Sequence, residues 1–338
     1  MFTLLTRSLI LRLALAVALA LAAVTAIAWW YAQRPLKLAQ PVIDFTVQRG
    51  FTMRQAATSI AAAGIDVSPR MLYWLARTTG KGDKILAGSY EVHQGVTPWL
   101  LILKMSSGDV SQGEARLQEG WTFRQVRVAL ESNPDLLHDT VGLSETDLLQ
   151  AIGASELHLE GLFFPDTYLF DKQSSTIAVL KRAYVRMQRQ LAEAWESREA
   201  QLPLTSPYEA LILASIIEKE TGRPEDRGLV ASVFINRLRA GMKLQTDPTV
   251  AYGYGETLEG RLRKWHLETD HPYNTYTRTG LPPTPIAMPG REALNAAVRP
   301  TQTDFLYFVS RGDGSSEFSR NLDEHNKAVS RYQRGPGS

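Results

Sequence analysis

The chain has 338 residues, of which 44% are hydrophobic and 21% charged, so it has room for two folded domains of ordinary size. The formal net charge of +2 argues against a nucleic-acid-binding protein, because binding nucleic acid needs a concentrated basic face. The chain has no cysteine, which excludes disulfide bonds and a thiol nucleophile, and its six histidines show no metal-binding spacing. We therefore expect no metal and no other cofactor.

The N-terminal segment predicts a single transmembrane helix. Residues 13–31 carry no charge, and Thr25 is the one side chain among them outside the apolar and aromatic classes. A run of this length approaches the roughly 20 residues that span a bilayer. Arg7 and Arg12 precede it, which places the N-terminus in the cytoplasm, and the sequence WWY closes it as an aromatic belt would. A cleaved signal peptide is the alternative, although its apolar core would be shorter, roughly 7–15 residues, and would end in small residues.

The residues after this helix predict a short linker at 32–41 and then a small α+β module. One pattern is shared by the sequences VQRGFTMRQA and LQEGWTFRQV. Each predicts a strand, a turn at Gly and a helix that begins at Thr, because Thr52 and Gln55 form a capping box that the second copy repeats. We interpret a weaker third copy, VHQGVTPWLL, as shared capping chemistry alone. The module therefore spans 42–112, and the second copy opens the next unit.

Two long helices are predicted further along the chain. Residues 176–200 place apolar side chains at helical spacing among many charges, which predicts a solvated amphipathic helix with a structural role. The next helix lies in SPYEALILASIIEKETG. Local chemistry bounds it, with Ser206 as the N-cap, Pro207 at the first helical position and Gly222 as the stop. It is apolar all round before its last turn, so we expect most of it to be buried.

Two glutamates in the last turn of this helix are candidate acids. The helix dipole and the apolar surroundings both disfavour a charged carboxylate there, so both raise its pKa. A carboxylic acid that is still protonated near neutral pH suits general acid catalysis on a glycosidic oxygen. Glu218 and Glu220 point about 200° apart around the helix. Glu218 continues the buried run, whereas we expect Glu220 to face outward beside Lys219 and Arg223. Glu218 is therefore the predicted catalytic residue, and a solvated or salt-bridged glutamate is the alternative.

Other segments gather carboxylates, tyrosines and amides. LEGLFFPDTYLF carries Glu160 and Asp166, and VFINRLRAGMKLQTDPTVAYG places Asp247 at the start of a new helix. A long loop stiffened by five prolines, HPYNTYTRTGLPPTPIAMPG, carries Asn274 and Tyr276. Because tyrosine rings stack on sugar faces and amides pair with sugar hydroxyls, these loops suit a sugar polymer as the ligand.

Five segments carry a resemblance to a known family: EGLFFPDTY, ASIIEKET, VFINRLRAGMKLQTDPTVAYG, YNTYTRTGLPP and EHNKAV. In their order, and with the N-terminal helix, they resemble the endolytic murein transglycosylase family, also called the YceG-like family. The resemblance extends from the membrane helix to about Tyr332 and includes every motif position. It is looser before residue 112, where the small module is similar to the LysM-like wall-binding module of the family in outline.

The resemblance implies an enzyme that cuts inside peptidoglycan glycan strands, between N-acetylmuramic acid and N-acetylglucosamine, without adding water. The family's catalytic glutamate falls on Glu218. It would protonate the leaving oxygen and then, as a carboxylate, accept the proton of the substrate's own C6 hydroxyl while a 1,6-anhydro ring closes. One acid then suffices, whereas an ordinary glycoside hydrolase needs two carboxylates. The matched motifs imply four substrate-binding residues: Gln245, Thr246, Asn274 and Tyr276.

The implied protein has an α+β fold, with a single N-terminal transmembrane helix, a small LysM-like module and a larger mixed α+β catalytic domain. The expected parts are a cytoplasmic N-terminus at 1–8, the transmembrane helix at 9–31, the linker at 32–41, the LysM-like module at 42–112, the YceG-like catalytic domain at 113–332 and a flexible tail at 333–338. The helix would lie in a bacterial inner membrane, with the catalytic domain in the periplasm. The expected partners are peptidoglycan strands and the membrane synthases whose nascent strands the enzyme would terminate.

Two other classes of protein remain open from the sequence. The first is a hydrolase that cuts the same bond with water activated by Asp166 or Asp247. The second is a non-enzymatic scaffold that binds the cell wall through the N-terminal module.

Overall fold

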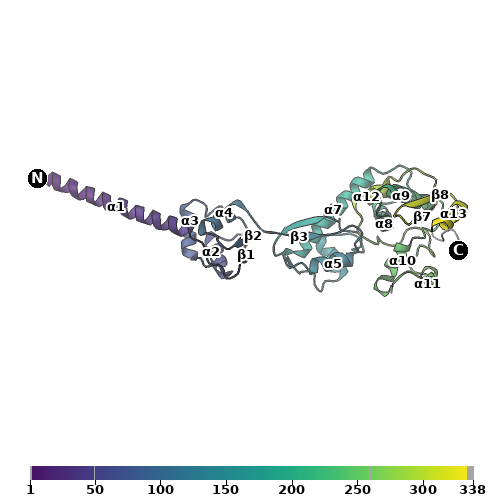
Figure 1. The fold of residues 1–338 in the computed structure, drawn as a ribbon, viewed down its shortest axis with the longest axis horizontal. Helices are drawn as coiled ribbons and strands as arrows, with labels where there is room; N and C mark the ends of the chain where they lie inside the picture. Colours follow the sequence, from purple (N-terminus) through teal and green to yellow (C-terminus); the bar gives the residue numbers. More distant parts are fainter. Residues whose placement is uncertain (1, 49, 259, 333–338) are drawn as a thin grey trace. The chain divides into compact units, whose positions relative to one another are not determined.

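The computed structural model describes residues 2–48, 50–258 and 260–332 (Figure 1), so the predicted tail at 333–338 lies outside the described residues. Helices and short strands are mixed along the whole chain, which confirms an α+β fold. The chain divides into two compact units. The first comprises residues 1–113 with 170–173, and the second comprises 114–169 with 174–338.

The first unit begins with the long helix α1 (Phe2–Gln33). Residues 11–30 of this helix are exposed, whereas Tyr31 and Ala32 are buried. Within the described residues, Leu11–Gln33 is the one segment that is long and apolar enough to cross a membrane. Because its apolar side chains have no protein cover, α1 is consistent with a single-pass membrane anchor.

A small α+β module follows α1 in the first unit. Its elements are β1 (Val42–Val47), α2 (Met53–Ala62), α3 (Pro69–Thr78), β2 (Gly88–His93) and α4 (Pro98–Ser107). The two strands pair antiparallel from Val42 opposite His93 to Val47 opposite Gly88. Stacked Phe45 and Tyr90, with ring centroids 5.4 Å apart, form part of the core beneath the helices. The likeness of this module to LysM domains remains a prediction.

The predicted helix starts are confirmed. Thr52 accepts a hydrogen bond from the Gln55 backbone N–H while the Gln55 side chain accepts one from Thr52, which makes a complete capping box before α2. The same box, formed by Thr122 and Gln125, precedes α5 (Phe123–Glu131) in the second unit. At α4, Thr97 is the N-cap and a proline takes the first helical position. Short-range capping chemistry therefore sets the repeated strand–turn–helix pattern.

The remaining elements belong to the second unit, except for the first two residues of β3 and the last two of β5, which fall in the first. After α5 its helices are α6 (Glu145–Ile152), α7 (Thr176–Glu196), α8 (Pro207–Glu220), α9 (Pro224–Arg239), α10 (Asp247–Tyr254), the 3-10 helix η1 (Gly255–Thr257), α11 (Lys264–Glu268), α12 (Arg291–Val298) and α13 (Leu322–Tyr332). The strands are β3 (Gln112–Arg116), β4 (Leu136–Leu137), β5 (Thr167–Asp171), β6 (Ser174–Ser175), β7 (Tyr307–Ser310) and β8 (Ser316–Ser319). They pair as β3 with β5, β4 with β6 and β7 with β8.

Helix α8 is the centre of the second unit. It packs against α12, α7, α9 and α10, and every residue from Ala210 to Ile217 is buried, as predicted. Each buried leucine or isoleucine contributes about 1.5–3 kcal/mol relative to an exposed one, so α8 is held mainly by apolar burial. Its N-terminus is capped by Ser206, as predicted.

The predicted stop of α8 at Gly222 is wrong. The C-cap is Thr221, whose backbone is extended at φ −141° and ψ 128°. The Thr221 hydroxyl accepts the N–H of Arg223 at 3.1 Å, and Pro224 then begins α9. The chain therefore passes from α8 to α9 through extended residues, and no left-handed glycine is needed at the end of α8.

Candidate active site

The C-terminal end of α8 opens into a cleft of about 600 Å³. Its walls come from the ends of α8 and α9, the loop before α10, the loop after α11, strand β7 and helix α13. Its polar lining includes Glu220, Arg237, Gln245, Asp247, Tyr276 and His325. Three of these residues, Gln245, Asp247 and Tyr276, belong to the segments that the sequence marks as candidate sugar-binding loops.

Glu220 is turned into this cleft, and the prediction that it faces outward is wrong. The loop before α10 packs against the last turn of α8, so that the Thr246 hydroxyl donates a hydrogen bond to Glu220 Oε1. Burial raises the pKa of Glu220, and the charge of Asp247 raises it further. The Thr246 hydrogen bond and Arg237 act in the opposite direction, but burial is the larger effect. The environment of the cleft therefore favours protonation of Glu220 more than water favours protonation of a free glutamate.

Two loops that are distant in sequence hold this carboxyl group in place. Gln245 adopts a left-handed backbone at φ 50° and donates its N–H to the Thr275 carbonyl at 3.1 Å. The N–H of Thr246 donates to the Thr275 hydroxyl at 3.0 Å. On the cleft side, the Tyr276 hydroxyl donates to Asp247 Oδ1 at 2.6 Å. The structure thus brings Gln245, Thr246 and Tyr276 together, and it brings them to Glu220.

Arg237 is a cleft residue that the sequence analysis does not single out. It is 7% exposed, and its Nε donates to the Leu306 carbonyl while an Nη atom donates to the Leu244 carbonyl, both at 2.7 Å. These carbonyl contacts fix a positive charge in the wall beside Glu220. The sequence did contain a signal for this residue, because Arg237 lies in a segment that carries the family resemblance, on a helix that is otherwise largely apolar around it.

Asn274 lies inside the protein rather than in the cleft wall. It is 1% exposed, and its Nδ2 donates to the carbonyls of His266, Leu267 and Thr269 at 2.7–3.1 Å. Its Oδ1 accepts the N–H of Tyr276 at 2.9 Å. Because every hydrogen-bonding group of this amide is used within the loop, we propose that Asn274 positions Tyr276 and does not itself bind sugar.

We expect Asn274→Ala to lower the free energy of unfolding by about 1–3 kcal/mol, because buried carbonyls lose their donor. Tyr276 would lose its support, and cleavage would slow as well. Thermal unfolding and cleavage rates of the purified variant test this, with Tyr276→Phe as the control that keeps the loop and removes one cleft hydroxyl. Weakened substrate binding with unchanged stability would instead make Asn274 a sugar-binding residue.

Glu218 occupies the other side of α8 and does not line this cleft. Its Oε2 accepts the N–H of Gly290 at 2.9 Å. Burial raises the pKa of Glu218, the Gly290 hydrogen bond lowers it, and the nearby charge of Glu119 raises it again. The pKa of Glu218 is thus shifted in the direction that suits a general acid, but its carboxylate is hydrogen-bonded to the backbone of the segment before α12.

Glu160 is a second buried acid, in a smaller cleft of about 390 Å³. Both of its oxygens accept the N–H of Phe123 at the start of α5, at 3.0 and 3.1 Å, and Oε2 also accepts the hydroxyl of Tyr252 at 3.1 Å. Burial raises the pKa of Glu160 to about 7 against the lowering effect of these hydrogen bonds. Glu160 therefore ties α5 to α10.

The raised pKa of Glu160 predicts a pH-dependent stability. The folded protein keeps this proton up to about pH 7, whereas the unfolded chain loses it near pH 4.5. Between these values the folded state binds more protons, so stability falls as the pH rises, by about 3 kcal/mol in total. We expect Glu160→Gln to remove this fall in unfolding experiments across that range, and Glu196→Gln, at the exposed end of α7, to retain it. An unchanged pH dependence in Glu160→Gln would contradict the assignment.

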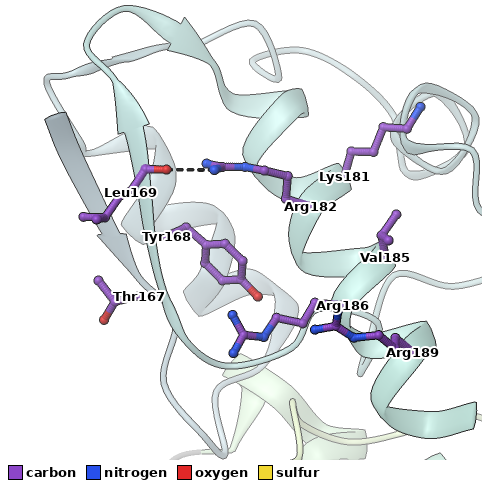
Figure 2. Close-up of a pocket in the computed structure, with 8 residues that line it drawn as sticks. All are labelled: Thr167, Tyr168, Leu169, Lys181, Arg182, Val185, Arg186 and Arg189. Atoms are coloured by element: carbon purple, nitrogen blue, oxygen red, sulfur yellow. Dashed lines mark hydrogen bonds between the residues drawn. The ribbon is translucent and has the colours of Figure 1, made fainter. Parts of the chain in front are cut away.

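Asp166 is the second carboxylate of the segment LEGLFFPDTYLF, and it lies on a different surface from Glu160. It pairs with Arg186 of α7 at 2.5 Å. Figure 2 shows Arg186 beside Tyr168, in a groove of about 720 Å³ between β5 and α7 whose basic side chains are Lys181, Arg182, Arg186 and Arg189. The Arg182 guanidinium donates to the Leu169 carbonyl at 2.8 Å, which ties the helix to the strand (Figure 2). Asp166 is therefore paired with an arginine of this groove and does not line the cleft of Glu220.

Within the part of the chain that the structure describes, there is no group of three or more histidine, aspartate or glutamate side chains that could hold a metal ion. The chemistry available in the cleft of Glu220 comes from a carboxyl group with a raised pKa, a second carboxyl group at Asp247, the guanidinium of Arg237 and hydroxyl donors.

Known proteins are similar to this chain in sequence and in fold. The model of the YceG-like family matches residues 45–331. An endolytic murein transglycosylase of Bacillus subtilis is 30% identical over 313 residues, which cover 88% of this chain and 86% of the relative. An endolytic murein transglycosylase of Streptococcus pneumoniae is 23% identical over 319 residues, which cover 85% of this chain and 57% of the relative. The crystal structure of a YceG-like protein from Listeria monocytogenes matches with a TM-score of 0.54 at 28% identity, over 85% of this chain and 98% of that one.

Proposed function

Since the chain belongs to the YceG-like family, we propose that it is an endolytic murein transglycosylase. Two relatives with this name support the proposal, one of them matched over 86% of its length. The observation that carries the chemistry is Glu220, a carboxyl group with a raised pKa in a polar cleft formed by the matched segments. The proposed substrate is the glycan strand of peptidoglycan, cut within the strand.

The proposed reaction breaks the bond from N-acetylmuramic acid to N-acetylglucosamine. Glu220, whose raised pKa favours the protonated form, donates its proton to the glycosidic oxygen as the bond breaks. The resulting carboxylate accepts the proton of the muramic acid C6 hydroxyl, whose oxygen attacks C1 and closes the 1,6-anhydro ring. The same residue thus donates one proton and regains one, and no water is consumed. The Thr246 hydroxyl orients the carboxyl group, and Arg237 stabilises its charged form in the second step.

Glu218 is the alternative acid, proposed from the sequence resemblance. Its raised pKa supports it, but its carboxylate contacts the backbone of Gly290 and lies outside the cleft. Glu220 is favoured because the candidate sugar-binding residues Gln245 and Tyr276 line the same cleft.

A hydrolase that cuts the same bond is the second candidate function. Asp247 favours it, because this carboxylate lines the cleft with Glu220 and accepts the Tyr276 hydroxyl. Two carboxylates on either side of a glycosidic bond are the arrangement that ordinary glycoside hydrolases use. Asp166, which the sequence offered as another partner, is paired with Arg186 in a different groove.

The ends of the products test the proposed function. Purified peptidoglycan is digested by the full chain in detergent, and the muropeptides are separated and weighed by mass spectrometry. A transglycosylase that cuts within strands leaves shorter strands with new 1,6-anhydro-muramic acid ends, whereas a hydrolase leaves new reducing ends. No new ends of either kind would reject both enzymes and favour a wall-binding scaffold.

The proposed location follows from α1. We propose that it anchors the chain in the bacterial inner membrane with the N-terminus in the cytoplasm, and that the small module after α1 and the second unit lie in the periplasm. An enzyme held there would meet glycan strands as the membrane synthases produce them, and would terminate nascent strands. The first unit, proposed as a LysM-like module, would contribute wall binding.

A further inference from the structure

The small module of the first unit is joined directly to the end of the proposed membrane anchor. Trp30 is 61% exposed, but the next residue of α1, Tyr31, is only 3% exposed. The Tyr31 hydroxyl donates to the carbonyl of Ser68 at 3.5 Å, and the N–H of Leu36 donates to the carbonyl of Val96 at 2.8 Å. The module therefore begins within one residue of the exposed part of α1, without a free linker between them.

These contacts place the start of α3 at the end of the anchor. Ser68 is the N-cap of α3, and Figure 1 shows α3 on the side of the module from which α1 leaves. The other contact, at Val96, lies just before α4. If a membrane surrounds the last exposed turn of α1, its surface therefore lies next to the first turn of α3.

Helix α3 has one buried face and one unusual exposed face. Leu72 and Ala76 are fully buried in the module. On the opposite side, Met71 is 44% and Trp74 is 53% exposed. The exposed arginines of this helix, Arg70 and Arg77, flank these two apolar side chains. A tryptophan between arginines on an amphipathic helix is the composition of helices that lie in the membrane interface.

The end of α1 carries the same combination. The guanidinium of Arg34 lies 5.1 Å from the ring centroid of Tyr31 and 5.8 Å from that of Trp30. Tyr31 is buried in the protein, so Trp30 and Arg34 are the groups at this end that can meet lipid: indole rings settle at the headgroup level, and arginine pairs with lipid phosphates there. Two neighbouring elements of the unit thus present aromatic and cationic side chains where the anchor would leave the bilayer.

We propose that the exposed face of α3 lies in the headgroup region of the membrane that holds α1, with Met71 and Trp74 toward the acyl chains and Arg70 and Arg77 on the phosphates. This inference rests on the proposed membrane anchor. It makes the module a base that rests on the membrane surface and cannot rotate freely about the end of α1. Covering the face with lipid also removes two large apolar side chains from water.

Single-cysteine spin labelling of the full chain tests the proposal, because the natural sequence has no cysteine. The variants Met71→Cys and Trp74→Cys are labelled and reconstituted in vesicles of phosphatidylcholine and phosphatidylglycerol. Collision of the label with oxygen, which concentrates in lipid, is compared with collision with a water-soluble nickel complex. We expect the ratio of oxygen to nickel collision at both positions to be several-fold higher than at a water-exposed control.

Leu86→Cys is the matched control in the same module. Leu86 is 50% exposed, and its N–H donates to the carbonyl of Met105 in the last turn of α4. Met105 lies seven positions beyond Pro98, the first residue of α4, so it is about 10 Å along the helix from the end beside Val96. Its label should remain aqueous. Val17→Cys, in the exposed part of α1, reports whether the anchor itself enters lipid.

The outcomes are distinct. A lipid-like label at Val17 together with aqueous labels at Met71 and Trp74 would overturn the inference and leave the anchor intact. Labels at Met71 and Trp74 that are shielded from both oxygen and nickel would also overturn it, because a protein or a second copy would then cover α3. An aqueous label at Val17 would reject the anchor on which the inference rests. Agreement between the two α3 variants guards against one of them misfolding.

Discussion

Replacing Glu220 by glutamine is expected to lower the rate of murein cleavage by about 10²–10⁴-fold, the usual contribution of a general acid and base. Glutamine keeps the shape of the side chain and can still accept the Thr246 hydroxyl, so the fold should be retained. It has no proton to donate to the glycosidic oxygen and cannot accept one from the C6 hydroxyl. Initial rates on purified peptidoglycan, with unfolding curves of both proteins, separate lost chemistry from lost structure.

Glu218→Gln is the matched control, because it changes the same residue type on the opposite side of the same helix. Its amide oxygen can still accept the Gly290 N–H, and we expect it to keep most of the activity. The pH profile adds a second criterion. Because the pKa of Glu220 is raised and the acid must be protonated, activity should fall as the pH rises through that pKa. An inactive Glu218→Gln beside an active Glu220→Gln would transfer the catalytic role to Glu218.

The largest effect on stability is expected from Gly161→Ala. Gly161 has φ +80°, a left-handed conformation that costs a residue with a side chain about 1–2 kcal/mol. A Cβ at this position would lie 2.4 Å from Pro285 Cβ and 2.6 Å from its Cγ. A proline ring cannot rotate away, so overpacking adds about 1–3 kcal/mol. Unfolding of the detergent-solubilised chain in urea should show a total loss of about 2–5 kcal/mol.

Gly153→Ala separates the two causes of this loss. Gly153 has φ +77°, as the C-cap of α6, but a Cβ there would meet nothing within 4 Å. We expect this variant to lose only the backbone contribution, about 1–2 kcal/mol. Equal losses in the two variants would mean that the contact of Gly161 with Pro285 adds nothing to stability.

The sequence was most informative where the determinants of structure are local. The capping boxes at Thr52 and Thr122 and the N-cap at Ser206 depend on residues within four positions of each other, and each was predicted correctly. The burial of Ala210–Ile217 also followed from composition, because a helix that is apolar on all sides has no stable place in water. The family followed from five segments in order, and the match over residues 45–331 bears it out.

The environment of the two glutamates could not be predicted in the same way. Helical geometry places Glu218 and Glu220 on different sides of α8, but it does not say which loop packs on which side. Thr246 is 26 positions from Glu220, and the contact between them depends on how the loop before α10 folds back. The residue types in the loop did not reveal which side chains face the cleft. Asn274 and Tyr276 were therefore both predicted to bind substrate, although Asn274 is buried and Tyr276 lines the cleft.

Digestion of peptidoglycan in water enriched in heavy oxygen tests the central claim most directly. The wild-type chain cleaves the strands, the new ends are reduced with borohydride to prevent exchange, and the muropeptides are weighed. A transglycosylase closes the ring with an oxygen from the substrate, so the proposed mechanism predicts anhydro ends without heavy oxygen. Reducing ends that carry one heavy oxygen would contradict it and identify a hydrolase, with Asp247 as the carboxylate that activates water.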